Sequence, residues 1–262
     1  MKSPPIAVIR RTSRIWQRNW TVYRQTWKIS FVPPLLEPLF YLLAFGVGLS
    51  ALVGEVSYRG EALSYVAFIA PALVAINIMN NAFFENTYAS FVRMYYQKTF
   101  DAILATPLSL TEIILGEIVW GATKSVIGTA IMLVVISAFG LIAYPHGLLL
   151  LPVALLGGLA FGAIAMLFTS VVPNIETFNL PVFLFVTPMF LFSGTFFPVD
   201  TLPVWFRSLA LFLPLTHLVR LTRDLAYGRL DLSLLWAVGY LLLFCAIVTP
   251  LAIGRMRRRL IR

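Results

Sequence analysis

Long apolar runs separated by short polar segments dominate the chain. A helix that crosses the roughly 30 Å hydrocarbon core of a bilayer needs about 20 mostly apolar residues. The runs that meet this criterion are approximately Leu35–Val53, Ala62–Phe84, Ile113–Phe139, Gly147–Val172, Phe178–Phe197 and Leu234–Gly254. They lack the alternating pattern of membrane barrel strands. The pattern therefore predicts an all-α integral membrane protein with six transmembrane helices.

The composition supports a membrane protein and excludes a soluble enzyme. Hydrophobic residues make up 60% of the 262 residues and charged residues only 12%, whereas a soluble domain carries about 25% charged residues. The mean hydropathy is +0.87. A single cysteine, Cys245, cannot form an intrachain disulfide.

The net charge of +9 reflects membrane topology rather than a nucleic-acid interface. Lys and Arg concentrate in the N-terminal arm and the C-terminal tail, beside apolar runs. The connecting segments on the side of the two termini hold 14 of them, and the segments on the other side hold 5. Because cytoplasmic segments are enriched in Lys and Arg, we expect both termini in the cytoplasm and no nucleic-acid partner.

Residues 1–34 predict an amphipathic helix on the cytoplasmic face. Trp16, Trp20 and Trp27 recur at helical spacing, with Arg14 just before them and Arg18 between the first two. A helix of this kind lays its apolar face on an anionic leaflet, so membrane lipids are expected partners. Plain membrane anchoring is an equally good interpretation.

The segment from residue 85 to residue 112 is too polar to span the membrane and too apolar for a simple loop. Phe100, Ile103 and Leu104 fall on one side of a short helix, and Pro107 ends it. Such a helix can dock into a groove on a partner. A loop lying flat on the bilayer is the alternative.

The segment from residue 198 to residue 233, on the outer side, contains two short amphipathic patterns separated by Leu213–Pro214. Each pattern is too short and too charged to span a bilayer. Irregular backbone survives at membrane depth only inside protein or beside water. We therefore expect re-entrant or interfacial helices before the last span.

The chain lacks the motifs of common catalytic sites. The dipeptide Gly-Lys does not occur, so there is no P-loop for nucleotide phosphates. No Cys-x-x-Cys or His-x-x-x-His is present, and His146 and His217 are far apart in sequence. We expect no enzymatic activity, no metal and no cofactor bound by this chain.

Two charged residues fall within the third predicted span. Lys124 lies well inside it, where a charge costs about 2.5–3.5 kcal/mol unless it is paired or hydrated. Glu117 lies two turns earlier on the same helical face, too far for an easy direct bridge. A polar lining, an intersubunit contact, and a structural pair with Glu117 or with a carboxylate of another helix all remain open.

Four stretches carry a resemblance to a known family. They read EPLFYLLAFGVGL, FENTYASFVRM, PLSLTEIILGEIVWGATKS, and FLFSGTFFPVDTLPVWF followed by LPLTHLVRLTRDL. In this order and with this hydropathy, the chain resembles the ABC-2 type transport permeases, most closely their NodJ-like branch, which exports lipo-oligosaccharides. The resemblance covers nearly the full length.

The resemblance implies an architecture and partners. The permease would form a homodimer with two copies of a separate ATPase subunit that binds ATP and Mg, in the bacterial inner membrane. A coupling helix is implied at about residues 93–106 and re-entrant helices at about 198–226, within a six-span domain at 35–254. A basic tail, 255–262, would follow in the cytoplasm.

The resemblance also implies functional residues. The expected contacts with the ATPase are Glu85, Arg93, Phe100, Asp101, Leu104, Thr106 and Pro107. The candidates for a substrate pathway are Tyr41, Phe45, Asn77, Asn80, Asn81, Phe183 and Phe192. Aromatic rings stack on sugar faces and apolar walls suit lipid chains, but ordinary helix packing would use the same side chains.

The implied activity is export of an amphiphilic substrate, such as a lipo-oligosaccharide, a polysaccharide or a lipid-like molecule. No residue distinguishes these from a drug or antibiotic efflux substrate. An ion-coupled secondary transporter would show intramembrane carboxylates or an inverted repeat, and only Glu117 and Lys124 hint at the former. A membrane enzyme would need an acid–base cluster, for which the best candidates are Asp200, His217, Arg220 and Asp224.

Overall fold

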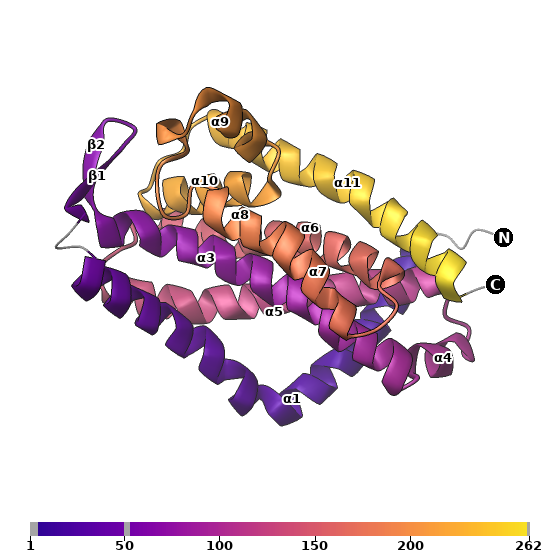
Figure 1. Ribbon diagram of the computed structural model, residues 1–262. Coiled ribbons are helices and arrows are strands. Elements are labelled where there is room, and N and C mark those ends of the chain that lie inside the picture. The colour runs from indigo at the N-terminus through magenta and orange to yellow at the C-terminus, as the bar shows by residue number, and fades with distance from the viewer. Residues whose placement is uncertain (1–4, 50–52, 261–262) are drawn as a thin grey trace.

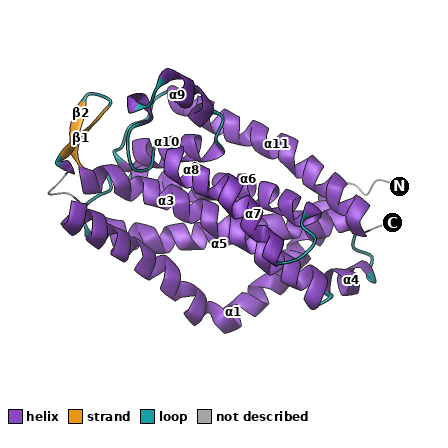
Figure 2. Ribbon diagram, viewed as in Figure 1, coloured by secondary structure: helices purple, strands orange, loops and turns teal. Residues whose placement is uncertain are grey.

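A computed structural model describes residues 5–49 and 53–260 as an elongated bundle of helices with one small hairpin (Figures 1 and 2). The all-α membrane class is confirmed. Within these ranges, four helices are long and apolar enough to cross a membrane: Tyr65–Tyr96, Leu110–Ala138, His146–Val171 and Ser233–Leu260. Two other predicted spans correspond to shorter apolar helices, Phe31–Leu43 and Glu176–Phe192.

The N-terminal arm and the first predicted span form one helix, α1 (Pro5–Leu43), followed by a π-helical turn, Ala44–Leu49. No break between helices separates the arm from the span at the expected boundary, residue 34. Instead, α1 changes direction sharply along its length (Figure 1). Proline kinks a helix because it lacks an N–H and crowds the carbonyl four residues earlier, and α1 contains Pro33. Residues 50–52 of the predicted span lie outside the described residues.

A β-hairpin that the sequence reasoning did not predict precedes the second span. Strands β1 (Glu55–Tyr58) and β2 (Glu61–Ser64) pair antiparallel, with Tyr58 opposite Glu61. The connecting residues Arg59 and Gly60 both have positive φ, 51° and 84°, as a tight two-residue hairpin turn requires. The prediction that residues 62–64 belong to a span is therefore wrong.

Helix α3 (Tyr65–Phe84) begins at Ser64, whose side chain accepts a hydrogen bond from the Ala67 N–H. It continues through π-helical turns at Glu85–Ala89 and Val92–Tyr96. The predicted cytoplasmic loop thus starts some twelve residues too early. Its first half extends α3 because aromatic and β-branched side chains keep packing beyond residue 84.

Two helices follow the extended α3. Lys98, with φ of 54°, breaks the backbone direction before the short helix α4 (Thr99–Leu104). Helix α5 (Leu110–Ala138) then starts with a capping box, in which Ser109 and Glu112 satisfy each other's backbone N–H groups.

Helix α6 (Leu150–Val171) packs closely along α5. A Cβ on Gly158 would lie 2.6 Å from the Cα of Ala122, so glycine permits this approach. The next apolar segment contains α7 (Asn179–Pro181), a π-helical turn and α8 (Thr187–Phe192). It ends five residues before the predicted end at Phe197.

The outer segment contains the two short helices expected from its pattern, α9 (Val204–Leu211) and α10 (Pro214–Ala226). Their axes are bent by 86°. Helix α11 (Ser233–Leu260) runs beyond the predicted span. Residues 255–260 of the predicted tail are therefore helical, and 261–262 lie outside the described residues.

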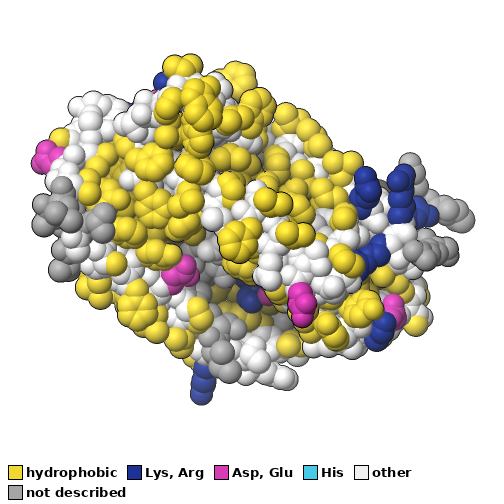
Figure 3. Space-filling model, viewed as in Figure 1, with side chains coloured by type: hydrophobic (Ala, Val, Ile, Leu, Met, Phe, Trp, Pro, Cys, Tyr) yellow, Lys and Arg dark blue, Asp and Glu magenta, His cyan; other side chains and the backbone are white. Residues whose placement is uncertain are grey.

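The two ends of the bundle differ. Helix α1 begins and α11 ends beside α4, whereas the hairpin lies at the opposite end (Figure 1). Lys and Arg side chains gather at the α4 end, and hydrophobic side chains cover most of the face between the ends (Figure 3). We call these the α4 end and the hairpin end.

Candidate functional site: a charge network and its cavities

A chain of ion pairs links α5 to the extension of α3. Glu85 lies between two cations: its Oε1 is 2.8 Å from Arg93 Nη1, and its Oε2 is 2.8 Å from Lys124 Nζ. The indole Nε1 of Trp120 also donates to Glu85 Oε1, over 3.1 Å. Donors therefore reach both oxygens of this carboxylate.

Glu117 on α5 holds the other side of Arg93. Arg93 Nε donates to Glu117 Oε2 over 2.9 Å, and Arg93 Nη2 contacts the same oxygen. Ser90 Oγ donates to it as well, over 2.6 Å. From α1, Asn19 Nδ2 donates to Glu117 Oε1 over 3.0 Å. Three segments of the chain thus meet at this carboxylate.

This arrangement identifies the partner of Lys124. The lysine pairs with Glu85, a carboxylate of another helix, and Glu117 pairs with Arg93. Helical periodicity explains the register, because Glu117 and Lys124 are two turns apart on α5, as are Glu85 and Arg93 on the extended α3. Charges alternate in sign along the four residues, which we call the charge network.

The alternation matters because the network lies largely away from water. Glu85 is 7% exposed and Glu117 only 2%. An ionised group costs several kcal/mol to bury unless it is paired and hydrogen-bonded. Each carboxylate oxygen of the network has at least one donor. Removing one member would leave its partners with less compensating charge in a largely buried site.

The backbone brings these helices together through π-helical turns and a glycine. The turn at Glu85–Ala89 contains the first carboxylate of the network, and such turns are frequent at functional sites. On α5, a Cβ at Gly121 would lie 1.9 Å from Asn86 Nδ2. Any larger residue at this position would force the buried Asn86 side chain to move.

The N-terminal half of α1 packs on α5 beside the network. The rings of Trp16, Trp20 and Tyr23 lie 5.6–6.4 Å from Trp120, centroid to centroid. Trp16 Nε1 also donates to Thr123 Oγ1 over 2.9 Å. For Trp16 and Trp20, contact with α5 therefore replaces part of the lipid contact that the sequence pattern predicts.

A cavity of about 510 Å³ opens between α1, α3 and α5, next to the network. Asn77, Asn80 and Asn81 line it from α3 and Lys124 from α5, and Glu37 lies on the α1 side. In the space-filling view the surface is hollowed above α1, and charged side chains are visible inside (Figure 3). The structure thus brings the three predicted asparagines together.

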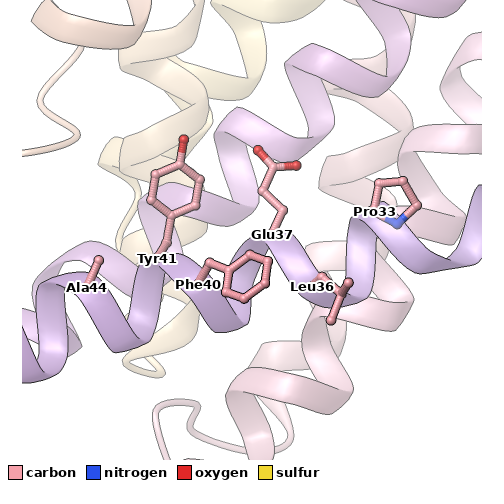
Figure 4. A pocket seen from close by; sticks show the side chains of 6 residues that line it. All are labelled: Pro33, Leu36, Glu37, Phe40, Tyr41 and Ala44. Atoms are coloured by element: carbon pink, nitrogen blue, oxygen red, sulfur yellow. The ribbon is translucent and has the colours of Figure 1, made fainter.

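The C-terminal half of α1 supplies the opposite wall. Glu37 and Tyr41 point to one side of α1 and Leu36 to the other (Figure 4). Glu37, Tyr41 and Asn77 also line a small cavity deeper between α1 and α3. Phe45 stacks on Tyr41, with 5.8 Å between ring centroids. Tyr41 and Phe45 therefore lie next to each other, and Tyr41 lines the small cavity, but neither residue lines the 510 Å³ cavity.

Two other predicted pathway residues lie elsewhere. The Phe183 side chain is 71% exposed on the outside of the α7–α8 segment. Phe192 packs against Phe206 of α9, with 4.6 Å between ring centroids. Neither lines the cavity next to the network, so the structure does not group them with the asparagines.

Helix α4 presents a different face from the one predicted. Phe100 is 1% exposed and packs into the hydrophobic core of the α4 end, so a contact between its ring and a partner is excluded in this arrangement. Arg93 belongs to the charge network and not to α4. The predicted contact residues that remain on the surface are Asp101, Thr106 and Pro107, with Leu104 half-buried.

The sequence profile of the ABC-2 type transporter family matches residues 10–227. This range contains the charge network, the asparagine-lined cavity and α4. The chain belongs to the ABC-2 type transporter family. It is therefore a multi-pass membrane protein of the transport permease type.

Individual relatives agree with this ABC-2 assignment. The chain is 39% identical over 248 residues to Nodulation protein J of Rhizobium leguminosarum bv. trifolii, which covers 95% of this chain and 93% of the relative. It is 36% identical over 247 residues to Nodulation protein J of Rhizobium meliloti, covering 94% and 92%. It is 24% identical over 238 residues to the inner membrane transport permease YadH of Escherichia coli, covering 88% of each. The resemblance to the NodJ-like branch is confirmed.

Of the four polar residues considered for a membrane enzyme, Asp200, Arg220 and Asp224 lie close together, but each acid is engaged by an arginine. Asp224 pairs with Arg59, and Asp200 pairs with Arg207. His217 Nε2 lies 2.8 Å from a backbone carbonyl of α9. Within residues 5–49 and 53–260, no group of three or more His, Cys, Asp or Glu side chains is arranged to hold a metal ion.

Sequence reasoning missed three partners in the network of this permease: Asn19, Ser90 and Trp120. A signal existed for Trp120, because it lies between Glu117 and Lys124 at i+3 and i+4 spacing and so on the same helical face. Asn19 and Ser90 gave no such signal. Their contacts depend on how three separate segments pack.

Proposed function

We propose that this chain is the permease subunit of an ABC exporter, and that two copies of a separate ATPase subunit drive it. The observation that carries the proposal is the position of α4 beside the charge network. Its polar side is exposed while Phe100 fixes it to the bundle. ATP and Mg would be bound by the ATPase subunits. Membership of the ABC-2 family supports the same division of labour.

The charge network gives this proposal a mechanical route. A displacement of α4 would be transmitted to the extended α3 through Phe100, because Phe100 packs in the same buried cluster as Phe91 and Met94. Arg93 then ties α3 to Glu117 of α5, and Asn19 ties Glu117 to α1. ATP binding would bring the ATPase subunits together, and the permease helices would move as rigid bodies.

The cavity between α1 and α3 suits an amphiphilic substrate. Amide side chains of Asn77, Asn80 and Asn81 can hydrogen-bond hydroxyl and amide groups, as a saccharide requires. On α1, Leu36, Phe40 and Tyr41 line an adjoining groove that is almost wholly apolar (Figure 4), where an alkyl chain would rest. We infer a lipo-oligosaccharide, a polysaccharide or a lipid-like molecule, exported from the inner leaflet. A drug or antibiotic with the same amphiphilic character is the second candidate.

We further propose six spans, a homodimer and the bacterial inner membrane. Residues 31–49 provide a helical stretch of about 28 Å at 1.5 Å per residue, and local thinning of the bilayer accommodates the shorter Glu176–Phe192 helix. An even number of crossings agrees with termini at one end (Figure 1). The Lys and Arg side chains gathered there favour a cytoplasmic location (Figure 3).

An ion-coupled transporter is less well supported. Its carboxylates would have to take up and release protons or cations. Glu85 and Glu117 are instead held by Arg93, Lys124 and neutral donors. Transport in ATP-free vesicles that carry a proton gradient would favour this alternative.

The proposed role of α4 is tested by reversing one exposed charge. The chain is co-expressed with candidate ATPase subunits and purified through a tag on the permease, and ATP hydrolysis and transport are measured in proteoliposomes. We expect Asp101→Arg to lower transport at least fivefold relative to ATP hydrolysis. Glu176→Arg, an exposed acid in the α6–α7 connection of the same end, is the matched control and should leave the ratio unchanged. Equal ratios for both variants would remove α4 from the coupling path.

A further inference from the structure

A second polar cavity lies at the hairpin end, separate from the charge network. Its volume is about 220 Å³, and the hairpin, the segment after α8, α9 and α10 all contribute to its wall. Among the described residues, four arginines and one acid, Asp200, line this cavity. The arginines are Arg59, Arg207, Arg220 and Arg223.

Arg223 is a buried cation whose hydrogen bonds go to carbonyl groups. It is 3% exposed, and it donates to the carbonyl oxygens of Phe68 and Gly194 over 3.1 Å and 2.9 Å. Across residues 5–49 and 53–260, no carboxylate oxygen lies within 4.0 Å of its nitrogen atoms. The guanidinium carbon also lies 3.8 Å from the centroid of the Phe68 ring. Carbonyl groups and an aromatic ring stabilise the cation, but they do not cancel its full charge.

The other arginines use up the nearby acids. Arg207 pairs with Asp200 at 2.7 Å, and Arg59 reaches Asp224 at 3.1 Å. Arg220 has only a contact of 3.9 Å with the same Asp224 oxygen. Asp224 is therefore shared, and the cavity keeps an excess of positive charge.

A buried hydroxyl in the wall also lacks a partner. Ser193 is fully buried and lines the cavity, and its Oγ makes no hydrogen bond to any described residue. A buried hydroxyl without a hydrogen bond destabilises a fold, because nothing compensates for the loss of its contact with water. The Ser193 hydroxyl therefore lines the same cavity as Arg220 and Arg223, whose charges are only partly compensated by nearby acids.

The surface beside the cavity is apolar. Arg207 and Leu211 of α9 line the cavity, whereas Val204, Trp205 and Leu209 of the same helix are exposed. Helix α9 thus exposes an apolar side and carries one arginine on the cavity side, and amphipathic helices of this kind lie at membrane interfaces. The cavity is thus placed where a headgroup at the outer surface of the bilayer would reach it.

We propose that this cavity binds a phosphoryl anion, supplied by a lipid headgroup or by a soluble phosphate compound. Guanidinium groups match phosphate oxygens in pairs, with short charge-assisted hydrogen bonds. The volume corresponds to about seven water molecules at roughly 30 Å³ each, which accommodates a phosphate group. Arg220 and Arg223 supply charge, and Ser193 supplies a neutral donor.

The test uses the full-length chain in neutral detergent and measures apparent binding constants by native mass spectrometry and by thermal unfolding. The probes are phosphatidylglycerol, a diacylglycerol with the same acyl chains, and inorganic phosphate. We expect phosphatidylglycerol to bind at least tenfold more tightly than the diacylglycerol. Arg220→Gln should weaken phosphoryl binding about tenfold, the loss of one charge-assisted hydrogen bond.

Two further variants make the result interpretable. Ser193→Ala removes an unpartnered hydroxyl, so it should weaken binding severalfold without lowering the unfolding temperature. Arg255→Gln, on an exposed residue at the α4 end, should leave binding unchanged. If inorganic phosphate reproduces the effect, the source is soluble, and if only the lipid binds, the source is the headgroup. Equal affinity for the diacylglycerol, or unchanged binding in both cavity variants, would overturn the proposal.

Discussion

Buried charge is handled in opposite ways at the two ends of this permease. At the α4 end, two cations and two carboxylates alternate along the charge network, and Arg93 is held by Glu85 on one side and Glu117 on the other. At the hairpin end, Arg223 is buried against carbonyl groups, and its neighbour Arg220 has only a 3.9 Å contact with a shared acid.

This difference in charge compensation suggests different roles for the two ends. A balanced network satisfies its own charges, so it holds α1, α3 and α5 together without any ligand. Guanidinium groups that outnumber the acids around a cavity leave positive charge that a bound anion would compensate. We therefore regard the first cluster as a structural joint and the second as a binding site.

The hairpin is itself fastened by this second cluster. Arg59 and Tyr58 both reach Asp224 of α10, and the Tyr58 hydroxyl donates over 3.0 Å. Burial, and then the nearby Asp224 carboxylate, raise the pKa of Tyr58. The phenol therefore keeps its proton at neutral pH and remains a donor.

The largest effect is expected when one carboxylate of the balanced charge network is removed. Glu85→Ala would leave Lys124 without its partner and Arg93 with one carboxylate instead of two. We expect a loss of about 3–5 kcal/mol in the free energy of unfolding, as for other broken buried pairs. Reversible unfolding in mixed micelles measures it. Asp101→Ala, an exposed acid at the same end, is the control and should cost less than about 0.5 kcal/mol.

A double-mutant cycle measures how strongly Glu85 and Lys124 are coupled. If the pair is coupled, Glu85→Ala combined with Lys124→Gln should be less destabilised than the sum of the two single variants, by about 0.5–3 kcal/mol. If the two free-energy changes simply add, Lys124 is stabilised by water in the cavity rather than by its ion pair with Glu85.

Sequence reasoning located the charged residues of this joint better than their partners. Lys124 stood out because a charge inside a span is costly, and the expectation of a carboxylate from another helix as one possible partner agrees with the structure. Phe100 was assigned to a partner interface because its spacing defined an apolar face. Spacing alone does not tell whether such a face meets another protein or the core of its own chain, and here it meets the core.

The fold shows the same limit at the level of elements. For the long spans α5, α6 and α11, hydropathy placed most helix ends within three residues of their observed positions; the exception is the C-terminal end of α11. It missed the β-hairpin, because the positive-φ turn at Arg59 and Gly60 is a property of two residues and not of a window. It also separated α1 into two parts, since helical packing against α5 is invisible in a hydropathy pattern.

A medium effect is expected from Asp224→Asn at the hairpin end. The change weakens the contact to Arg59 and leaves an acceptor for Tyr58, so we expect a loss of about 1–3 kcal/mol in the free energy of unfolding. Hydrogen exchange of residues 55–64 should accelerate as the hairpin loosens, while exchange in α5 stays unchanged. Asp231→Asn, the exposed second partner of Arg59, should cost about 0–1 kcal/mol. Equal effects of the two variants would show that burial of Asp224 does not matter.

The smallest predicted effect tests how α1 is attached to the joint. Trp16→Phe keeps an aromatic ring beside Trp120 but removes the hydrogen bond to Thr123, whose hydroxyl still donates to the Val119 carbonyl. Because only one neutral hydrogen bond is lost, we expect a loss of about 0.5–1.5 kcal/mol. Trp27→Phe, on the half-exposed part of the same helix, should have almost no effect on unfolding in micelles. If the two variants behave alike, the aromatic face of α1 rests on detergent or lipid as its sequence pattern predicts. A larger cost for Trp16 alone means that α5 has replaced lipid as the partner of that face, and that α1 belongs to the joint.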